Sequence, residues 1–165
     1  IKSKINDWPI ELDMNWGLDH GTWSVLRHLF PDASVPVIQL SIDYYQEPEF
    51  YFNFGKLLRF LRDQNVLLIG SGNIVHNLGR MTLDDSASDW AIEFDRLIKQ
   101  LIDQRDFQKL IDFKNLSDSK LAIPTAEHYL PLLYILGALD ADDEIEWFNE
   151  VCMNSSISMR SFVAK

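Results

Sequence analysis

Histidines are the residues of this chain whose type best suits chemistry, and there are four of them: His20, His28, His76 and His128. An imidazole gains or loses a proton near neutral pH and binds transition metals, so it can serve as a general base or as a metal ligand. Three of the four occupy loop or element-end positions near Gly, Asn or Pro, where side chains can face a cleft. His28 lies in the middle of a helical pattern, and we expect no role for it.

His76 has the most favourable position of the three. It stands in the segment Gly-Ser-Gly-Asn-Ile-Val-His-Asn, residues 70–77, directly after the apolar run at 66–69. Ligands of open α/β sheets bind at the edge just beyond the strand ends. The glycines allow a backbone to come close to a ligand, although they match no phosphate-binding fingerprint. A glycine turn with a capping or surface histidine explains the same residues equally well.

His128 and His20 each stand next to an acidic residue at a predicted helix start. In Pro-Thr-Ala-Glu-His, residues 124–128, a carboxylate and an imidazole are adjacent. Both bind transition metals, but neighbouring residues on a helix point about 100° apart, so only one of them would face an ion. An ordinary helix start is the commoner explanation. Asp19 before His20 is typical of a helix cap, which would make His20 a polar first-turn residue.

The elements that must position these histidines follow from the apolar spacing. Continuous apolar runs predict strands buried in a parallel sheet, and a strand, helix, strand order predicts a right-handed crossover. Residues 1–165 are therefore expected to form a single α/β domain with a mostly parallel central sheet flanked by helices. We expect helices over 19–30, 48–64, 90–101, 107–113 and 128–139, buried strands over 35–42 and 66–69, and a half-exposed strand over 156–163.

Composition excludes several classes of function. The chain has 165 residues and a net charge of -10, which argues against nucleic acid as a partner. Cys152 is the only cysteine, so no internal disulfide can form, and a reducing, cytoplasmic setting is expected. The sequence contains no apolar run of about 20 residues, so we expect no membrane span.

Three segments together resemble a known family. They are Gly-Leu-Asp-His-Gly-Thr-Trp-Ser-Val-Leu from 17, Gly-Ser-Gly-Asn-Ile-Val-His-Asn-Leu from 70, and Pro-Thr-Ala-Glu-His-Tyr-Leu-Pro-Leu-Leu-Tyr from 124. Their order and spacing are similar to those of the class III extradiol ring-cleavage dioxygenases of the LigB superfamily. The resemblance is to the C-terminal part of the proteins like DOPA 4,5-dioxygenase, and it runs from about residue 16 to the end of the chain.

The resemblance implies a LigB-like fold and an oxidoreductase that opens a catechol ring with O2 at a non-haem Fe(2+) or Zn(2+). It implies that His128 is a metal ligand. It also implies that His76 is the general base for a catechol hydroxyl, or a second ligand in zinc-loaded members. His20 would contact the substrate and the oxygen-derived intermediate.

The same resemblance implies that the metal site is incomplete in this chain. In the family, further histidine ligands come from an N-terminal segment, one of them in a His-Gly motif near its start, and we expect that whole segment to be missing here. We therefore expect a missing N-terminal segment or a partner chain to complete the site. Two alternatives remain open: a non-catalytic interaction or structural subunit of the same fold, and a zinc hydrolase.

Overall fold

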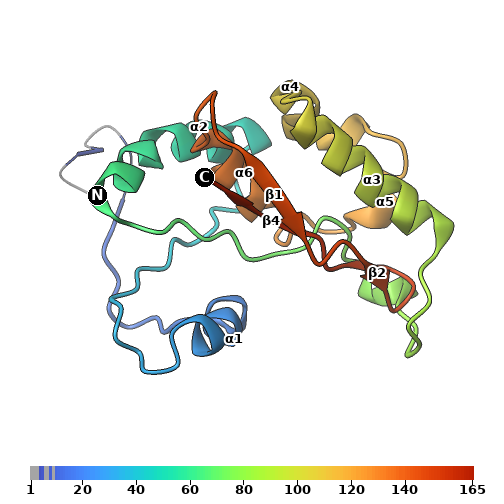
Figure 1. The fold of residues 1–165 in the computed structure, drawn as a ribbon, viewed down its shortest axis with the longest axis horizontal. Helices are drawn as coiled ribbons and strands as arrows, with labels where there is room; N and C mark the ends of the chain where they lie inside the picture. Colours follow the sequence, from blue (N-terminus) through green and yellow to red (C-terminus); the bar gives the residue numbers. More distant parts are fainter. Residues whose placement is uncertain (1–3, 6–7, 9) are drawn as a thin grey trace. The chain divides into compact units, whose positions relative to one another are not determined.

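The computed structural model describes residues 4–5, 8 and 10–165 (Figure 1). The chain divides into two compact units, Ile1–Asp43 and Tyr44–Lys165, which are described separately below. The expectation of a single domain stays a prediction.

The first unit contains one helix among its described residues, α1 (His20–Leu29), which confirms the helix expected over 19–30. The Asp19 carboxylate accepts a hydrogen bond from the Thr22 backbone N–H at 2.9 Å and so caps this helix, as its sequence position indicated. The Gln39 side-chain oxygen accepts from the Asp19 backbone N–H at 2.9 Å and from the Thr22 hydroxyl at 2.8 Å. The start of α1 is therefore fixed by residues before and after it.

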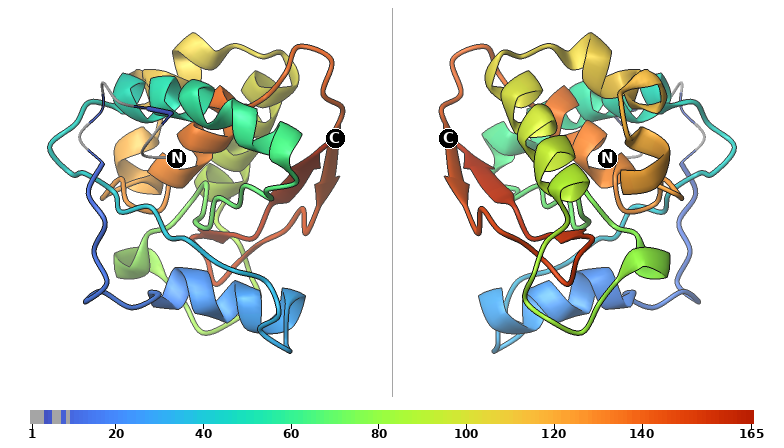
Figure 2. Two further views of the ribbon diagram at one scale, coloured as in Figure 1. Left: turned by 90° about the vertical axis from the view of Figure 1, so that its left-hand side faces the viewer. Right: turned by 90° about the vertical axis from the view of Figure 1, so that its right-hand side faces the viewer.

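Helices make up much of the second unit (Figure 2), and they confirm most of the helices expected there, with shifted ends. The helix expected over 48–64 begins at Pro48 and tightens into a 3-10 helix, and the helix expected from 128 begins at Leu130. None of the described helices has both the length and the apolar character needed to cross a bilayer. The helices are α2 (Pro48–Leu58), η1 (Arg59–Gln64), η2 (Leu78–Arg80), α3 (Asp89–Asp103), α4 (Phe107–Ile111), η3 (Phe113–Asn115), α5 (Ser119–Ala122) and α6 (Leu130–Gly137).

Helices α2 and α6 cross at close range because glycines stand at the crossing. A Cβ added to Gly55 would lie 2.1 Å from the Tyr134 carbonyl oxygen, and one added to Gly137 would lie 2.0 Å from the Phe52 carbonyl oxygen. Only a residue without a side chain fits either position, so these two glycines determine how deeply α6 sits against α2.

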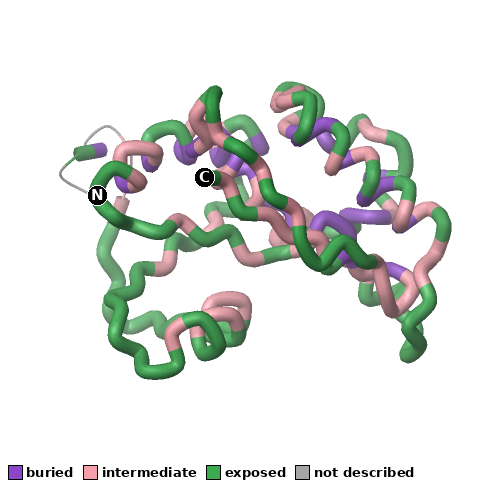
Figure 3. Tube along the Cα trace, viewed as in Figure 1, coloured by how far each residue is buried: buried purple, intermediate pink, exposed green. Residues whose placement is uncertain are grey.

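The core of the second unit lies between its helices, where Figure 3 shows most of the buried positions. Tyr129 is fully buried, its hydroxyl donates to the Leu110 carbonyl at 3.0 Å, and its ring packs against Phe113 with centroids 4.4 Å apart. Burial raises the pKa of the Tyr129 phenol far above its usual value, so the hydroxyl stays protonated. Tyr129 is therefore a core residue, in agreement with the usual fate of aromatics at helical spacing.

The expected parallel central sheet is not found among the described residues. They form two small antiparallel pairs instead, β1 (Ile145–Phe148) with β4 (Ser161–Ala164) and β2 (Cys152–Met153) with β3 (Ile157–Ser158). Runs 35–42 and 66–69 are not strands, and Ile38 and Leu67 are 75% and 64% exposed. The reason is physical: an extended run becomes a strand only when a neighbouring strand satisfies its backbone, and the described residues provide none.

The strand expected over 156–163 is also divided, into β3 and β4. It is anchored to α3 by a buried ion pair, in which Arg160 Nη2 lies 2.6 Å from Asp95 Oδ2. The Ser158 hydroxyl donates to the other carboxylate oxygen of Asp95 at 2.6 Å. The C-terminal segment therefore has a fixed position against the helices, which matters for the site because His76 pairs with Ile157 of β3.

Candidate functional site

Segment 70–77 runs against the turn that precedes α6. The Asn73 backbone N–H donates to the His128 carbonyl at 2.9 Å, and a Cβ on Gly72 would lie 2.1 Å from that same oxygen. The sequence indicated that these glycines permit a close backbone approach. Gly72 does so, but the group that it approaches is the chain's own backbone at His128.

The backbone of His76 is held on two sides. Its N–H donates to the Ala122 carbonyl at 2.9 Å, and the residue forms an antiparallel bridge with Ile157. The following residue, Asn77, donates from its side-chain amide to the Leu121 carbonyl at 2.8 Å. His76 is thereby fixed between the C-terminal end of α5 and the strand β3.

These two sets of backbone contacts bring His76 and His128 together. Their imidazole rings stack, with centroids 3.6 Å apart and planes inclined by 19°. Both residues are half-buried, and His76 also lines a pocket. Two groups that can bind a metal or exchange a proton near neutral pH therefore share one position in the second unit.

Glu127 adds a negative charge beside the pair. Burial raises the pKa of the Glu127 carboxyl, but the net shift of this pKa is downward. The Thr125 hydroxyl donates a hydrogen bond to the carboxylate at 2.6 Å, and a backbone hydrogen bond also lowers the pKa. The nearby His128 and His76 lower it further by favouring the charged carboxylate. The pKa of the Tyr44 phenol is raised, mainly by burial and to a smaller extent by the negative charge of Glu127. Glu127 is thus a charged partner of the imidazoles.

His76 and Glu127 line an open pocket with a volume of about 340 Å³. Its other walls come from the turn after His76, at Asn77, Leu78 and Gly79, and from Pro124 and Thr125. The pocket offers an imidazole and a carboxylate to a small molecule, which is the combination used in acid and base catalysis and in metal binding.

The stacked arrangement of His76 and His128 does not suit both as ligands of one transition metal. A metal lies in the plane of the imidazole that binds it, about 2.0–2.1 Å from the nitrogen. Two stacked planes 3.6 Å apart and inclined by only 19° share no point that close to both rings. The observed arrangement suits one ligand with a second imidazole beside it, but not two ligands of one ion. Among the described residues, no group of three or more His, Cys, Asp or Glu side chains could hold a metal.

His20 and His28 belong to the first unit, on α1, and both are exposed. The structure therefore brings together His76 and His128 of the predicted site residues, and it describes His20 separately. His28 faces solvent near the C-terminal end of α1.

Sequence reasoning missed the residues that hold the pair in place. Ala122 and Ile157 do so through their backbone atoms. Because any residue type can make such contacts, the sequence does not indicate them. Glu127 was noted in the sequence beside His128. Its proximity to His76 could not be predicted, because it depends on how the turn at 124–129 folds against segment 70–77.

The fold and the site define a protein with two stacked imidazoles, one of which lines a pocket together with a carboxylate, an arrangement suited to proton transfer or metal binding. Residues 1–163 match the family described as the catalytic LigB subunit of aromatic ring-opening dioxygenase, and the chain belongs to this family. The family resemblance and the LigB-like fold expected from the sequence are confirmed.

Individual relatives agree with this assignment. The chain is 39% identical over 93% of its length to a 4,5-DOPA dioxygenase extradiol of Escherichia coli K12, and 31% identical over 83% to one of Beta vulgaris. It spans 59% and 52% of the length of these two proteins. The crystal structure of an uncharacterized protein from Escherichia coli K12 superposes with a TM-score of 0.89 at 37% identity, covering 97% of this chain and 68% of that one.

Proposed function

We propose that the protein is an extradiol dioxygenase that opens the ring of a catecholic substrate with O2 at a non-haem divalent metal, and that this chain supplies part of the active site. One observation carries the proposal: in a chain of the LigB family, His76 and His128 stack at 3.6 Å, with His76 lining a pocket. The names of the relatives support the same reaction class.

His128 is the proposed metal ligand and His76 the proposed general base. A catechol hydroxyl gives up its proton with difficulty near neutral pH, so an imidazole beside it lowers the cost of forming the bound anion. The stacked geometry supports this division of roles, because His76 is next to the proposed ligand without sharing an ion with it. Binding of one ion by both histidines would require one ring to turn out of the stack.

The proposed metal is Fe(2+) or Zn(2+), since imidazole binds both. His128 alone does not make such a site, and the described residues group no three side chains that would. We therefore place the remaining ligands outside the described residues, in a further segment or a partner chain. His20 is proposed to contact the substrate once the site is assembled.

The proposed substrate class is a small catechol. Relatives of the chain are named as 4,5-DOPA dioxygenases, so DOPA is the natural first candidate. The pocket beside His76, at about 340 Å³, has a volume in the range of sites for small molecules.

The test uses the full-length protein, purified without chelators and analysed for intact mass and metal content. Oxygen consumption and the absorbance of the ring-opened product are then followed with DOPA in the presence of Fe(2+) or Zn(2+). We expect consumption of one O2 per DOPA. Metal content should fall in His128→Ala but not in His76→Ala, whereas turnover should fall in both by about 100-fold or more.

His28→Ala is the matched control, since it removes an exposed imidazole from the other unit. It should keep both metal content and turnover. A metal-loaded protein that consumes no O2 with any catechol would overturn the proposal and favour a non-catalytic subunit or a hydrolase.

A further inference from the structure

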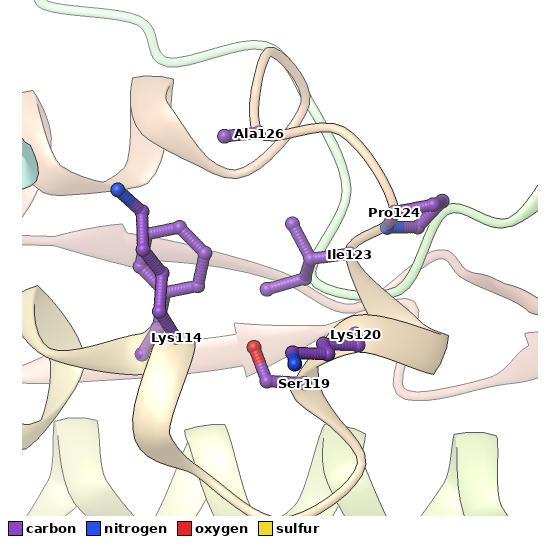
Figure 4. A pocket seen from close by; sticks show the side chains of 7 residues that line it. Lys114, Ser119, Lys120, Ile123, Pro124 and Ala126 are labelled. Atoms are coloured by element: carbon purple, nitrogen blue, oxygen red, sulfur yellow. The ribbon is translucent and has the colours of Figure 1, made fainter.

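A second pocket lies on α5 and the segments on either side of it, and it is lined differently from the pocket at His76 (Figure 4). Its volume is about 260 Å³, below the roughly 300–1,000 Å³ of sites for drug-sized ligands, so it suits a small molecule. Pro124 lines both pockets, whereas His76 and Glu127 line only the first.

The second pocket combines apolar walls with two positive charges. Phe113 and Ile123 are 2% and 8% exposed and present apolar surface, together with Pro124. Lys114 and Lys120 are exposed and bring ammonium groups to the rim, from η3 and from α5. In a chain with a net charge of -10, two lysines at one apolar hollow are a local exception to the overall charge.

The lysines are available to a ligand. Lys114 Nζ lies 3.4 Å from a Glu47 carboxylate oxygen, but the two side chains are 62% and 84% exposed, and exposed pairs of this kind contribute little. Lys120 forms no ion pair among the described residues.

Ser119 points to a ligand independently of the lysines. The residue is 3% exposed, yet its hydroxyl has no hydrogen-bond partner among the described residues. Figure 4 shows this hydroxyl directed toward the space between Lys114 and Ile123. Fully enclosed side-chain polar atoms of the described residues all have partners, so the Ser119 oxygen must be reached from the pocket. A buried hydroxyl that opens only into a hollow is ready to donate to an acceptor there.

We propose that this pocket binds a small carboxylate with an aromatic or other apolar body, separately from the site at His76 and His128. The carboxylate is received by the Ser119 hydroxyl and the ammonium groups of Lys114 and Lys120. The apolar body lies against Phe113, Ile123 and Pro124. Hydrogen bonds from charged donors to a carboxylate are about twice as strong as neutral ones, which selects an acid over its amide.

The proposal is tested by titrating the full-length, ¹⁵N-labelled protein with sodium phenylacetate at constant ionic strength, and following amide shifts by NMR. We expect saturable shifts at Ser119, Lys120 and Ile123, and none with phenylacetamide, which has the same body without the charge. Lys120→Gln and Lys114→Gln should each weaken binding by roughly fivefold, as expected for one charged donor. Both lysines are exposed, so neither variant endangers the fold.

Lys109→Gln is the matched control, because Lys109 is an exposed lysine of α4 that pairs with Asp106 and lines neither pocket. It should leave the affinity for phenylacetate unchanged. The proposal is overturned if the shifts do not saturate, if phenylacetamide binds equally well, or if the shifts centre on His76 and Asn77 and are indifferent to the lysine variants.

Discussion

The imidazoles of His76 and His128 lie face to face, 3.6 Å apart, yet their backbones are placed by contacts to other residues. The His76 backbone N–H donates to Ala122, while the His128 carbonyl accepts from Asn73. The geometry of the pair therefore depends on how two backbone segments fit together, and small shifts of either segment should alter it.

Replacing Gly72 with alanine is expected to disturb the pair without touching either imidazole. The new Cβ would lie 2.1 Å from the His128 carbonyl oxygen, so segment 70–77 and the turn at 128 must move apart. A misplacement of about 1 Å can cost about 100-fold in rate, and we expect a loss of that size in catechol turnover. Gly17→Ala, which meets nothing within 4 Å, should keep full turnover. Equal rates for the two variants would contradict the dependence of the pair on Gly72.

Gly137→Ala is expected to destabilise the second unit. Its Cβ would lie 2.0 Å from the Phe52 carbonyl oxygen, and backbone atoms of α2 can yield only if the two helices separate. We expect the free energy of unfolding in urea to fall by about 3 kcal/mol, the upper part of the range for overpacked cores. Gly17→Ala again serves as the control. Unchanged stability of Gly137→Ala would show that α6 can move away from α2 at little cost.

The ion pair between Asp95 and Arg160 should be important for the C-terminal segment. Their side chains are 4% and 7% exposed, and Asp95 also accepts from the Ser158 hydroxyl. Asp95→Asn leaves the buried Arg160 guanidinium with Glu150, whose side chain is 44% exposed, as its charged partner, so we expect a cost near the lower end of the about 3–5 kcal/mol typical of a broken buried pair. A double-mutant cycle with Arg160→Met measures the coupling by urea unfolding. Additive effects of the two substitutions would mean that the pair contributes nothing beyond its separate residues.

The helices could be predicted from the sequence because their signals are local. The Asp19 cap and the Pro48 start are each encoded within a few residues of the helix that they begin, and both are found in the structure. The exact boundaries of the helices were harder to predict. The turn at 124–129 contains helix-forming residues, but α6 begins only at Leu130.

The strands could not be predicted in the same way, because pairing depends on residues far away in the sequence. Runs 35–42 and 66–69 have the apolar composition of buried strands, but composition does not supply a partner. The pairing of β1 with β4, in contrast, joins residues 145–148, where no strand was expected, to the C-terminal strand.

The candidate site was partly predictable. His76 and His128 were identified by their positions beside glycine and proline and by the family resemblance, but their stacking follows from the close approach of Gly72 to His128. Ser119 in the second pocket carried no signal at all, because a serine near a short helix is common. The proposed role of Ser119 depends on the pocket that the fold forms around its hydroxyl.

Acid should weaken the second unit through Asp143. Arg62 donates to both of its carboxylate oxygens at 2.6 Å, and this lowers the pKa of Asp143 despite the opposing effect of burial, with the backbone N–H of Asp140 contributing as well. A carboxyl with a lowered folded-state pKa stabilises the fold above its unfolded-state pKa of about 3.9, and the contribution is lost as the pH falls through the folded-state value. Asp143→Asn should therefore reduce the free energy of unfolding by about 2 kcal/mol at pH 7, with the difference from the native protein shrinking below about pH 4. Urea unfolding from pH 7 to pH 3 measures this difference.

Asp142→Asn is the matched control for Asp143→Asn. It removes a neighbouring exposed carboxylate and should change stability by less than about 0.5 kcal/mol throughout this pH range. A deficit in Asp143→Asn that stays constant down to pH 3 would show that the side chain acts through packing rather than through its charge.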